Sequence, residues 1–255
     1  MPRRARILLW SVVGLLVFCP FMHLFGWQTL FAVEARYFAW KEPFLWSVPV
    51  ALADQSISES PGVRMSYNGY GFEVPWDDLD QNNTKRIHDW QIISFRSGKE
   101  IVLTGQEPDG AWNRAPILVK FTRAQSTGEP FGTDYAVQRH VLETSPARVT
   151  PFSSRRDAVD ALLSLLMKQT HYNLGGGNSV FLIQTPTYRG FQYGDPKSGD
   201  HAIEIRLYSK DGSFGLEFLS HKDAAHISQA EINRVLQTIR PVGDRDSQTK
   251  STDAQ

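Results

Sequence analysis

The N-terminal part of the chain carries a long apolar run. From Ile7 to Phe25 it contains no Asp, Glu, Lys or Arg, and such a run is long enough to cross a hydrocarbon core of about 30 Å as a helix. Arg3, Arg4 and Arg6 precede it, and positive charge at this flank favours a cytoplasmic N-terminus. We therefore predict that residues 1–25 form a basic flank and a transmembrane anchor. The chain is then a single-pass membrane protein with an extracytoplasmic C-terminal domain, either periplasmic or extracellular.

Two other interpretations of this run are a cleaved signal peptide and a lipoprotein signal. The run is long for a signal-peptide core, and the triplet Ala51-Leu52-Ala53 lies too far downstream for ordinary processing. A lipobox ending at Cys19 would place the bulky Phe18 where a small residue is expected. An uncleaved anchor agrees best with the pattern.

Residues 26–62 combine an aromatic-rich segment with a polar linker, Asp54–Gly62. The aromatic residues alternate with charged ones, which disfavours a second span: Trp27, Phe31, Tyr37, Phe38, Trp40, Phe44 and Trp46. An amphipathic helix at the outer membrane surface and a first helix packed on the domain core both agree with this pattern.

Residues 63–241 show strand patterns joined by turn residues. Asn68-Gly69 joins Val63–Tyr67 and Tyr70–Trp76 in a tight hairpin. The remaining predicted strands are Trp90–Phe95, Glu100–Thr104, Ile117–Thr122, Val180–Gln184, Arg189–Tyr193, Ala202–Ser209 and Phe214–Leu219. Asp211-Gly212 predicts a further hairpin between the last two, and the turn residues 96–99 predict another between Trp90–Phe95 and Glu100–Thr104.

Three helices are predicted in the same domain. The first covers Phe131–Glu143, with Thr133 or Asp134 as its N-cap. The second lies in residues 153–169, where Ser154 and Asp157 resemble a capping box. Its predicted core face consists of Val159, Leu162, Leu163, Leu166 and Met167. The third runs from Ser228 to Pro241, with Glu231 as the capping partner.

Hairpins bring neighbouring strands together antiparallel, and each helix has one apolar face to bury. We therefore predict an α+β fold, in which an antiparallel sheet built from hairpins is covered by helices and is preceded by one transmembrane helix. The soluble domain spans 63–241, and the polar tail 242–255 is predicted to be disordered.

Two segments at the ends of this domain resemble a known family. They are YGFEVPW at 70–76 and EINRVLQTIRP at 231–241, and they are similar to the edges of PsbP-like domains across Val63 to Pro241. Those domains are α/β/α sandwiches that commonly serve as assembly or binding modules. The resemblance implies that fold and implies no catalytic residues.

Composition narrows the choice of partner. Lys+Arg and Asp+Glu are both 27, so the chain has no basic excess with which to bind nucleic acid. The single cysteine, Cys19, lies in the apolar run, so the domain has no disulfide and no thiolate metal site. The predicted partners are the membrane, through the N-terminal helix, and a protein.

No catalytic, cofactor or metal motif stands out. There is no Gly-x-Ser-x-Gly, and Ser247 and Lys250 form a Ser-x-x-Lys only in the tail. Gly175-Gly176-Gly177 follows a helix and precedes a strand, the reverse of a phosphate cradle. Four histidines lack metal-ligand spacing and are interpreted as structural or surface residues: His171, His201, His221 and His226.

A recognition surface is placed on the strand Arg189–Tyr193 and the loop after it. Its residues are Arg189, Phe191, Tyr193, Asp195, Asp200 and His201. The function predicted from these patterns is non-enzymatic partner binding or assembly of an envelope complex. The alternatives left open are an extracytoplasmic hydrolase, for instance with His201 beside Asp195 or Asp200, and a small-ligand-binding domain.

Overall fold

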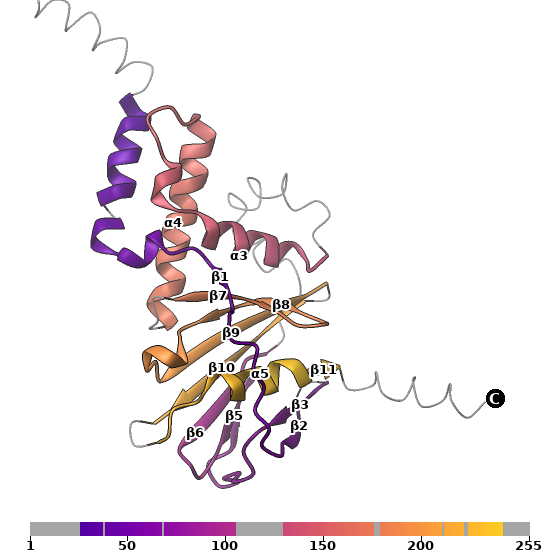
Figure 1. The fold of residues 1–255 in the computed structure, drawn as a ribbon. Helices are drawn as coiled ribbons and strands as arrows, with labels where there is room; N and C mark the ends of the chain where they lie inside the picture. The colour runs from indigo at the N-terminus through magenta and orange to yellow at the C-terminus, as the bar shows by residue number, and fades with distance from the viewer. Residues whose placement is uncertain are drawn as a thin grey trace, which may run out of the picture.

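The computed structural model describes residues 26–37, 39–67, 69–105, 130–175, 179–210, 212–221 and 224–241, with side chains to 169 in the fourth range and to 240 in the last (Figure 1). The predicted anchor, the predicted strand Ile117–Thr122, Gly176-Gly177 and the tail lie outside the described residues. Within the described ranges, no helix combines the length and the apolar character needed to cross a membrane.

One large sheet forms the middle of the molecule, in the order β1-β7-β8-β9-β10-β6-β5-β4. Its strands are β1 (Val50–Ala51), β4 (Lys85–Ile87), β5 (Trp90–Ser94), β6 (Lys99–Leu103), β7 (Val180–Gln184), β8 (Arg189–Tyr193), β9 (Ala202–Ser209) and β10 (Gly212–Ser220). All neighbours pair antiparallel except β1 and β7. The predicted α+β class is confirmed, and the one parallel pair makes the large sheet mixed.

A second sheet has the order β11-β3-β2, with β2 at Val63–Tyr67, β3 at Tyr70–Val74 and β11 at Arg240–Pro241. The predicted hairpins β2–β3, β5–β6 and β9–β10 are confirmed. Gly69 has a φ of +81°, which glycine adopts without the steric cost that a side chain brings. Strand β4 was not predicted, because its sequence Lys-Arg-Ile has no apolar alternation, and all three residues are exposed in the structure.

The helix α5 (Gln229–Thr238) and the small sheet cover one face of the large sheet. The predicted capping box is confirmed, because Ser228 accepts from the backbone of Glu231 while the Glu231 side chain accepts from the backbone of Ser228. The core that joins these elements consists of large aliphatic and aromatic side chains, including Phe72, Val74, Ile205, Leu207, Phe218, Ile232 and Val235. We call α5 and the small sheet the α5 layer.

The opposite face is covered by helices near β7, β8 and β9 (Figure 1). Residues 26–37 and 39–41 are helical and are called the leading helix. The leading helix, α3 (Thr133–Glu143) and α4 (Arg155–Gly175) make up the helical layer, with short 3-10 turns at η1 (Pro43–Trp46) and η3 (Pro146–Arg148). Another 3-10 turn, η4 (Pro196–Ser198), connects β8 to β9.

The structure corrects two predictions about these helices. The N-cap of α3 is Gly132, with a φ of +91° and no side-chain cap, rather than Thr133 or Asp134. The buried face of α4 consists of Ala158, Ala161, Ser164, Leu165 and Lys168, whereas Leu166 is exposed. Of the predicted core face, Leu162 packs against the core of the helical layer, and Val159, Leu163 and Met167 are half-buried. The prediction was wrong at Leu166 and missed the small side chains that let the leading helix pack closely against α4.

The linker Asp54–Gly62 lies along α5. Asn233 Nδ2 donates to the carbonyl oxygens of Asp54 at 2.9 Å and Ser56 at 2.8 Å, and Ser58 N donates to Ala230 O at 3.1 Å. The leading helix also packs into the core of the helical layer. Residues 26–62 are thus joined to the folded domain at both ends.

Candidate functional site

Two aromatic residues of the predicted recognition surface lie in the core. The Phe191 ring stacks on Tyr135 with centroids 5.5 Å apart, and Tyr193 Oη accepts a hydrogen bond of 2.7 Å from Gln138 Nε2. Both side chains are buried. They fasten α3 to β8 and are not part of the exposed surface.

The two aspartates after β8 shape a turn. Asp195 Oδ1 accepts from the backbone of Lys197 at 2.9 Å, and Asp200 Oδ2 accepts from the backbone of Asp195 at 2.8 Å. Gly199 has a φ of +81° between them. These bonds are ordinary turn chemistry.

His201 is exposed and lies beside β10. Its Nδ1 is 3.2 Å from Ser220 Oγ, and its ring centroid is 4.5 Å from that of His226. A hydrolytic base needs a third group that orients it, and neither Asp195 nor Asp200 bonds to His201. The described residues also hold no cluster of three potential metal ligands. These residues therefore give the hydrolase alternative no geometric support.

Arg189 alone among the predicted residues lies at an open groove. The groove has a volume of about 750 Å³, and lies between the start of α3 and the edge formed by β1, β7 and β8. Its walls combine Phe131, Tyr135 and Leu182 with Gln184 and Arg189. A space of this size is typical of sites for small ligands.

A buried lysine that sequence reasoning missed connects the elements of the helical layer. Lys168 Nζ donates to the carbonyl oxygens of Leu45 at 3.2 Å, Leu142 at 3.0 Å and Thr144 at 3.1 Å, and also to Ser47 O. Burial lowers the pKa of Lys168 to about 8, while the four carbonyl oxygens favour the ammonium form. The sequence holds no signal for this contact, because the acceptors are backbone atoms.

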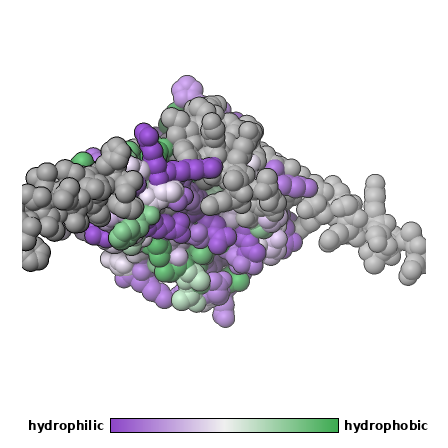
Figure 2. Space-filling view, turned by 90° about the horizontal axis from the view of Figure 1, so that it is seen from above, coloured by the Kyte–Doolittle hydropathy of each residue, from purple (hydrophilic) through white to green (hydrophobic). Residues whose placement is uncertain are grey.

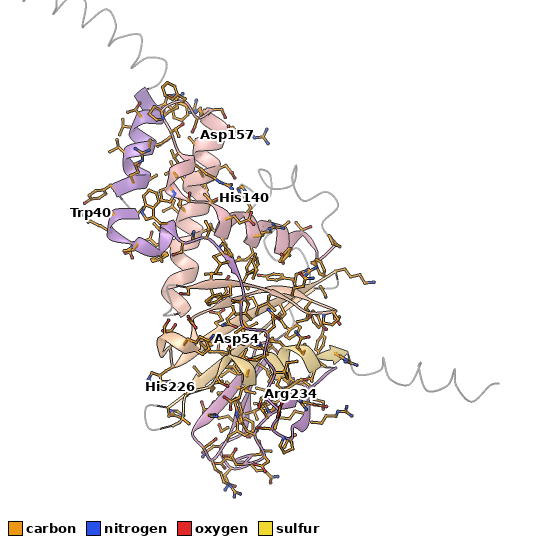
Figure 3. The ribbon with its side chains drawn as sticks, viewed as in Figure 1. Trp40, Asp54, His140, Asp157, His226 and Arg234 are labelled. Atoms are coloured by element: carbon orange, nitrogen blue, oxygen red, sulfur yellow. The ribbon has the colours of Figure 1, made fainter. Side chains whose placement is uncertain are left out.

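The leading helix presents large apolar residues on its outer side. Leu30 is 64% exposed, Val33 62%, Tyr37 52% and Trp40 77%, and we call these four residues the apolar stripe. Their spacing of three, four and three places them on one helical face, while Ala32, Ala35 and Ala39 are buried in the core of the helical layer. Figure 3 shows Trp40 on the side away from α4.

The surroundings of the apolar stripe are polar. Glu34, Arg36 and Lys41 are exposed on the same helix, and Lys41 Nζ lies 4.9 Å from the centroid of the Tyr37 ring. Seen from above, the described surface shows hydrophobic residues in separate patches among hydrophilic ones (Figure 2). An apolar strip with a polar rim is typical of a protein interface. Sequence reasoning noted the aromatic residues here but not the spacing that includes Leu30 and Val33.

Comparison with known proteins identifies no family. No family model matches the chain, and no curated protein matches it.

Proposed function

We propose that this chain is a membrane-tethered, non-enzymatic module that binds a partner protein and helps to assemble an envelope complex. Residues 7–25 serve as the anchor, and the folded domain lies on the extracytoplasmic side. The uncharged run of these residues and the arginines before it support this arrangement. The partner is a helix of a second membrane-anchored protein.

The observation that carries the proposal is the apolar stripe. Its 3-4-3 spacing is the spacing at which one helix packs against another. The opposite side of the leading helix is already buried against the domain, so the outer side is the one available to a partner. In the sequence, the described part of the leading helix follows the predicted anchor directly, which would place the stripe close to the membrane surface.

Fractionation tests the anchor. Membranes that contain the full-length chain are washed with alkaline carbonate and centrifuged at high speed. The proposal predicts that the chain stays in the pellet, and that in intact spheroplasts an external protease removes the domain. Release into the supernatant would contradict the anchor, and protection from the external protease would contradict the orientation.

Crosslinking in intact membranes tests the partner. The full-length chain should form an adduct with a second membrane protein, and the double substitution Leu30→Ser and Trp40→Ser should abolish it. Leu166→Ser is the matched control, because Leu166 is also an exposed apolar residue on a helix. Recovery of the chain alone, or an adduct that survives the double substitution, would contradict partner binding through the stripe.

The resemblance to PsbP-like domains agrees with a binding role. Helices lie on both faces of the large sheet, as they do in an α/β/α sandwich. Many α+β folds share this order of layers, and a fold alone does not define a function. The resemblance therefore supports the proposal less strongly than the stripe does.

A further inference from the structure

The groove beside α3 is positively charged where it meets the sheet. Among the described side chains that line it, two are arginines, Arg139 and Arg189, and none is an Asp or Glu. Arg139 Nε already pairs with Glu143 Oε1 at 2.8 Å. Arg189 forms no ion pair with an Asp or Glu among the described residues.

The surroundings of Arg189 leave its guanidinium incompletely satisfied. Its Cζ lies 5.1 Å from the centroid of the Phe131 ring, so the ring supports one contact with the cation. Its Nη1 is shielded from solvent and has no hydrogen-bond partner among the described residues. A shielded charged donor without an acceptor is costly, and an anion that binds the same guanidinium from the groove offsets part of that cost.

Apolar and aromatic surface lies next to this cation. Phe131 and Tyr135 contribute rings from the α3 side, and Leu182 on β7 is half-buried. Ala51 and Leu52 line the groove at the end of β1. A ligand that fits this lining has one acidic head and one apolar part.

We propose that the groove binds a small amphipathic anion. Its acidic head accepts hydrogen bonds from the Arg189 guanidinium, whose planar donors match the oxygens of a carboxylate or a phosphate. Its apolar part lies against Phe131, Tyr135 and Leu182. This site is independent of the anchor and of the apolar stripe, and so of the proposed partner binding.

The cross-strand neighbour of Arg189 provides a sharp test. Gln184 on β7 is directly opposite Arg189 on β8, lines the same groove and is exposed. Opposite residues on paired strands are close enough for their side chains to meet. The Gln184→Glu variant keeps the shape of the side chain. Its new carboxylate should form an ion pair with Arg189 and so compete with a ligand for the guanidinium.

The experiment uses the full-length chain in nanodiscs of neutral lipid. Binding of 3-phenylpropionate and of phenyl phosphate is measured by ligand-observed NMR, with 3-phenylpropanol as the uncharged probe. We expect at least one anion to bind tenfold or more tightly than the alcohol. The anion that binds more tightly identifies the preferred head group as carboxylate or phosphate.

The variants decide whether Arg189 is responsible. Arg189→Gln and Gln184→Glu should each weaken anion binding tenfold or more, and Gln184→Glu should also raise the thermal midpoint. Arg64→Gln, on β2 in the small sheet, is the control and should leave binding unchanged. Equal binding of the alcohol, no binding of either anion, or unchanged affinity in Gln184→Glu would overturn the proposal, even if Arg189→Gln failed to fold.

Discussion

The α5 layer and the helical layer cover opposite faces of the same sheet but are built differently. In the α5 layer, polar side chains pair with one another inside a core of large residues. The amides of Gln192 and Gln229 exchange hydrogen bonds of 2.7 and 2.9 Å, and Glu231 Oε1 accepts from Trp76 Nε1 at 2.6 Å and Lys99 Nζ at 2.8 Å. These buried pairs fix the position of α5 on the sheet.

The helical layer mixes alanines with aromatic side chains in its core and leaves large apolar side chains exposed on its outer side. Alanines from the leading helix and α4 meet in its core, while Leu30, Val33 and Trp40 are exposed. Its main buried polar group, Lys168, bonds to backbone carbonyls from two separate segments. The two layers thus differ in what they expose, and the apolar stripe of the helical layer is the surface on which the proposed partner binding depends.

The largest expected effect is in the α5 layer. Phe218 is fully buried in its core, so Phe218→Ala should destabilise the domain by about 3–5 kcal/mol. Leu166→Ala on α4 removes an exposed side chain and should cost less than about 1 kcal/mol. Urea unfolding of the full-length chain in mild detergent, followed by tryptophan fluorescence, measures both. Equal losses would contradict the burial of Phe218 and the exposure of Leu166.

Lys168 is predicted to be the most sensitive polar residue of the helical layer. Lys168→Met would leave carbonyl oxygens of η1 and the end of α3 buried without their donor, at a cost of about 3 kcal/mol. Lys197→Met is the control, because the Lys197 side chain is largely exposed, and should be nearly neutral. The same unfolding measurement applies, and a neutral Lys168→Met would show that the carbonyls find other donors.

The pH dependence of the α5 layer should depend on Glu231. Burial alone would raise the pKa of Glu231, but hydrogen bonds from Lys99, Trp76 and Ser228 hold it below its usual value. As the pH falls, Glu231 is protonated in the unfolded chain before it is protonated in the folded chain. The stabilisation that ionised Glu231 provides is therefore complete above about pH 4.3, the pKa of an unfolded Glu, and is lost as the pH falls through the lower pKa of the folded chain.

Glu231→Gln should therefore cost about 1–2 kcal/mol at neutral pH and should flatten the loss of stability with acid. Glu143→Gln removes an exposed pair with Arg139 and should change stability by less than about 0.5 kcal/mol. Unfolding midpoints across acidic pH values provide the comparison. If Glu231→Gln loses stability with falling pH as steeply as the unchanged chain does, another carboxyl group controls the acid dependence of stability.

The smallest expected change in stability is at the apolar stripe. Leu30→Ser and Trp40→Ser together should alter the free energy of unfolding by no more than about 0.5 kcal/mol each, because both side chains are exposed. A large loss would mean that the stripe is part of the domain core rather than a binding surface.

The contrast between the layers also explains what the sequence could predict. The hairpins and the capping box at Ser228 and Glu231 have local signals, and the structure confirms them. The buried face of α4 was only partly predictable from its leucines, because the chain places alanines, Ser164 and Lys168 in that contact beside Leu165. For the candidate site, the sequence pattern of β8 correctly indicated Arg189. The same alternation of residues does not show which face of the strand α3 covers, so Phe191 was predicted to be on the surface although it packs under α3.

The most direct test compares the apolar stripe with the β4 edge of the large sheet in the membrane. A photoreactive phenylalanine analogue replaces Trp40 on the apolar stripe or Ile87 on β4, both of which are exposed. Illumination of intact membranes should give an adduct with a second membrane protein from position 40 and none from position 87. An adduct from position 87 alone would contradict the account, as would no adduct from position 40.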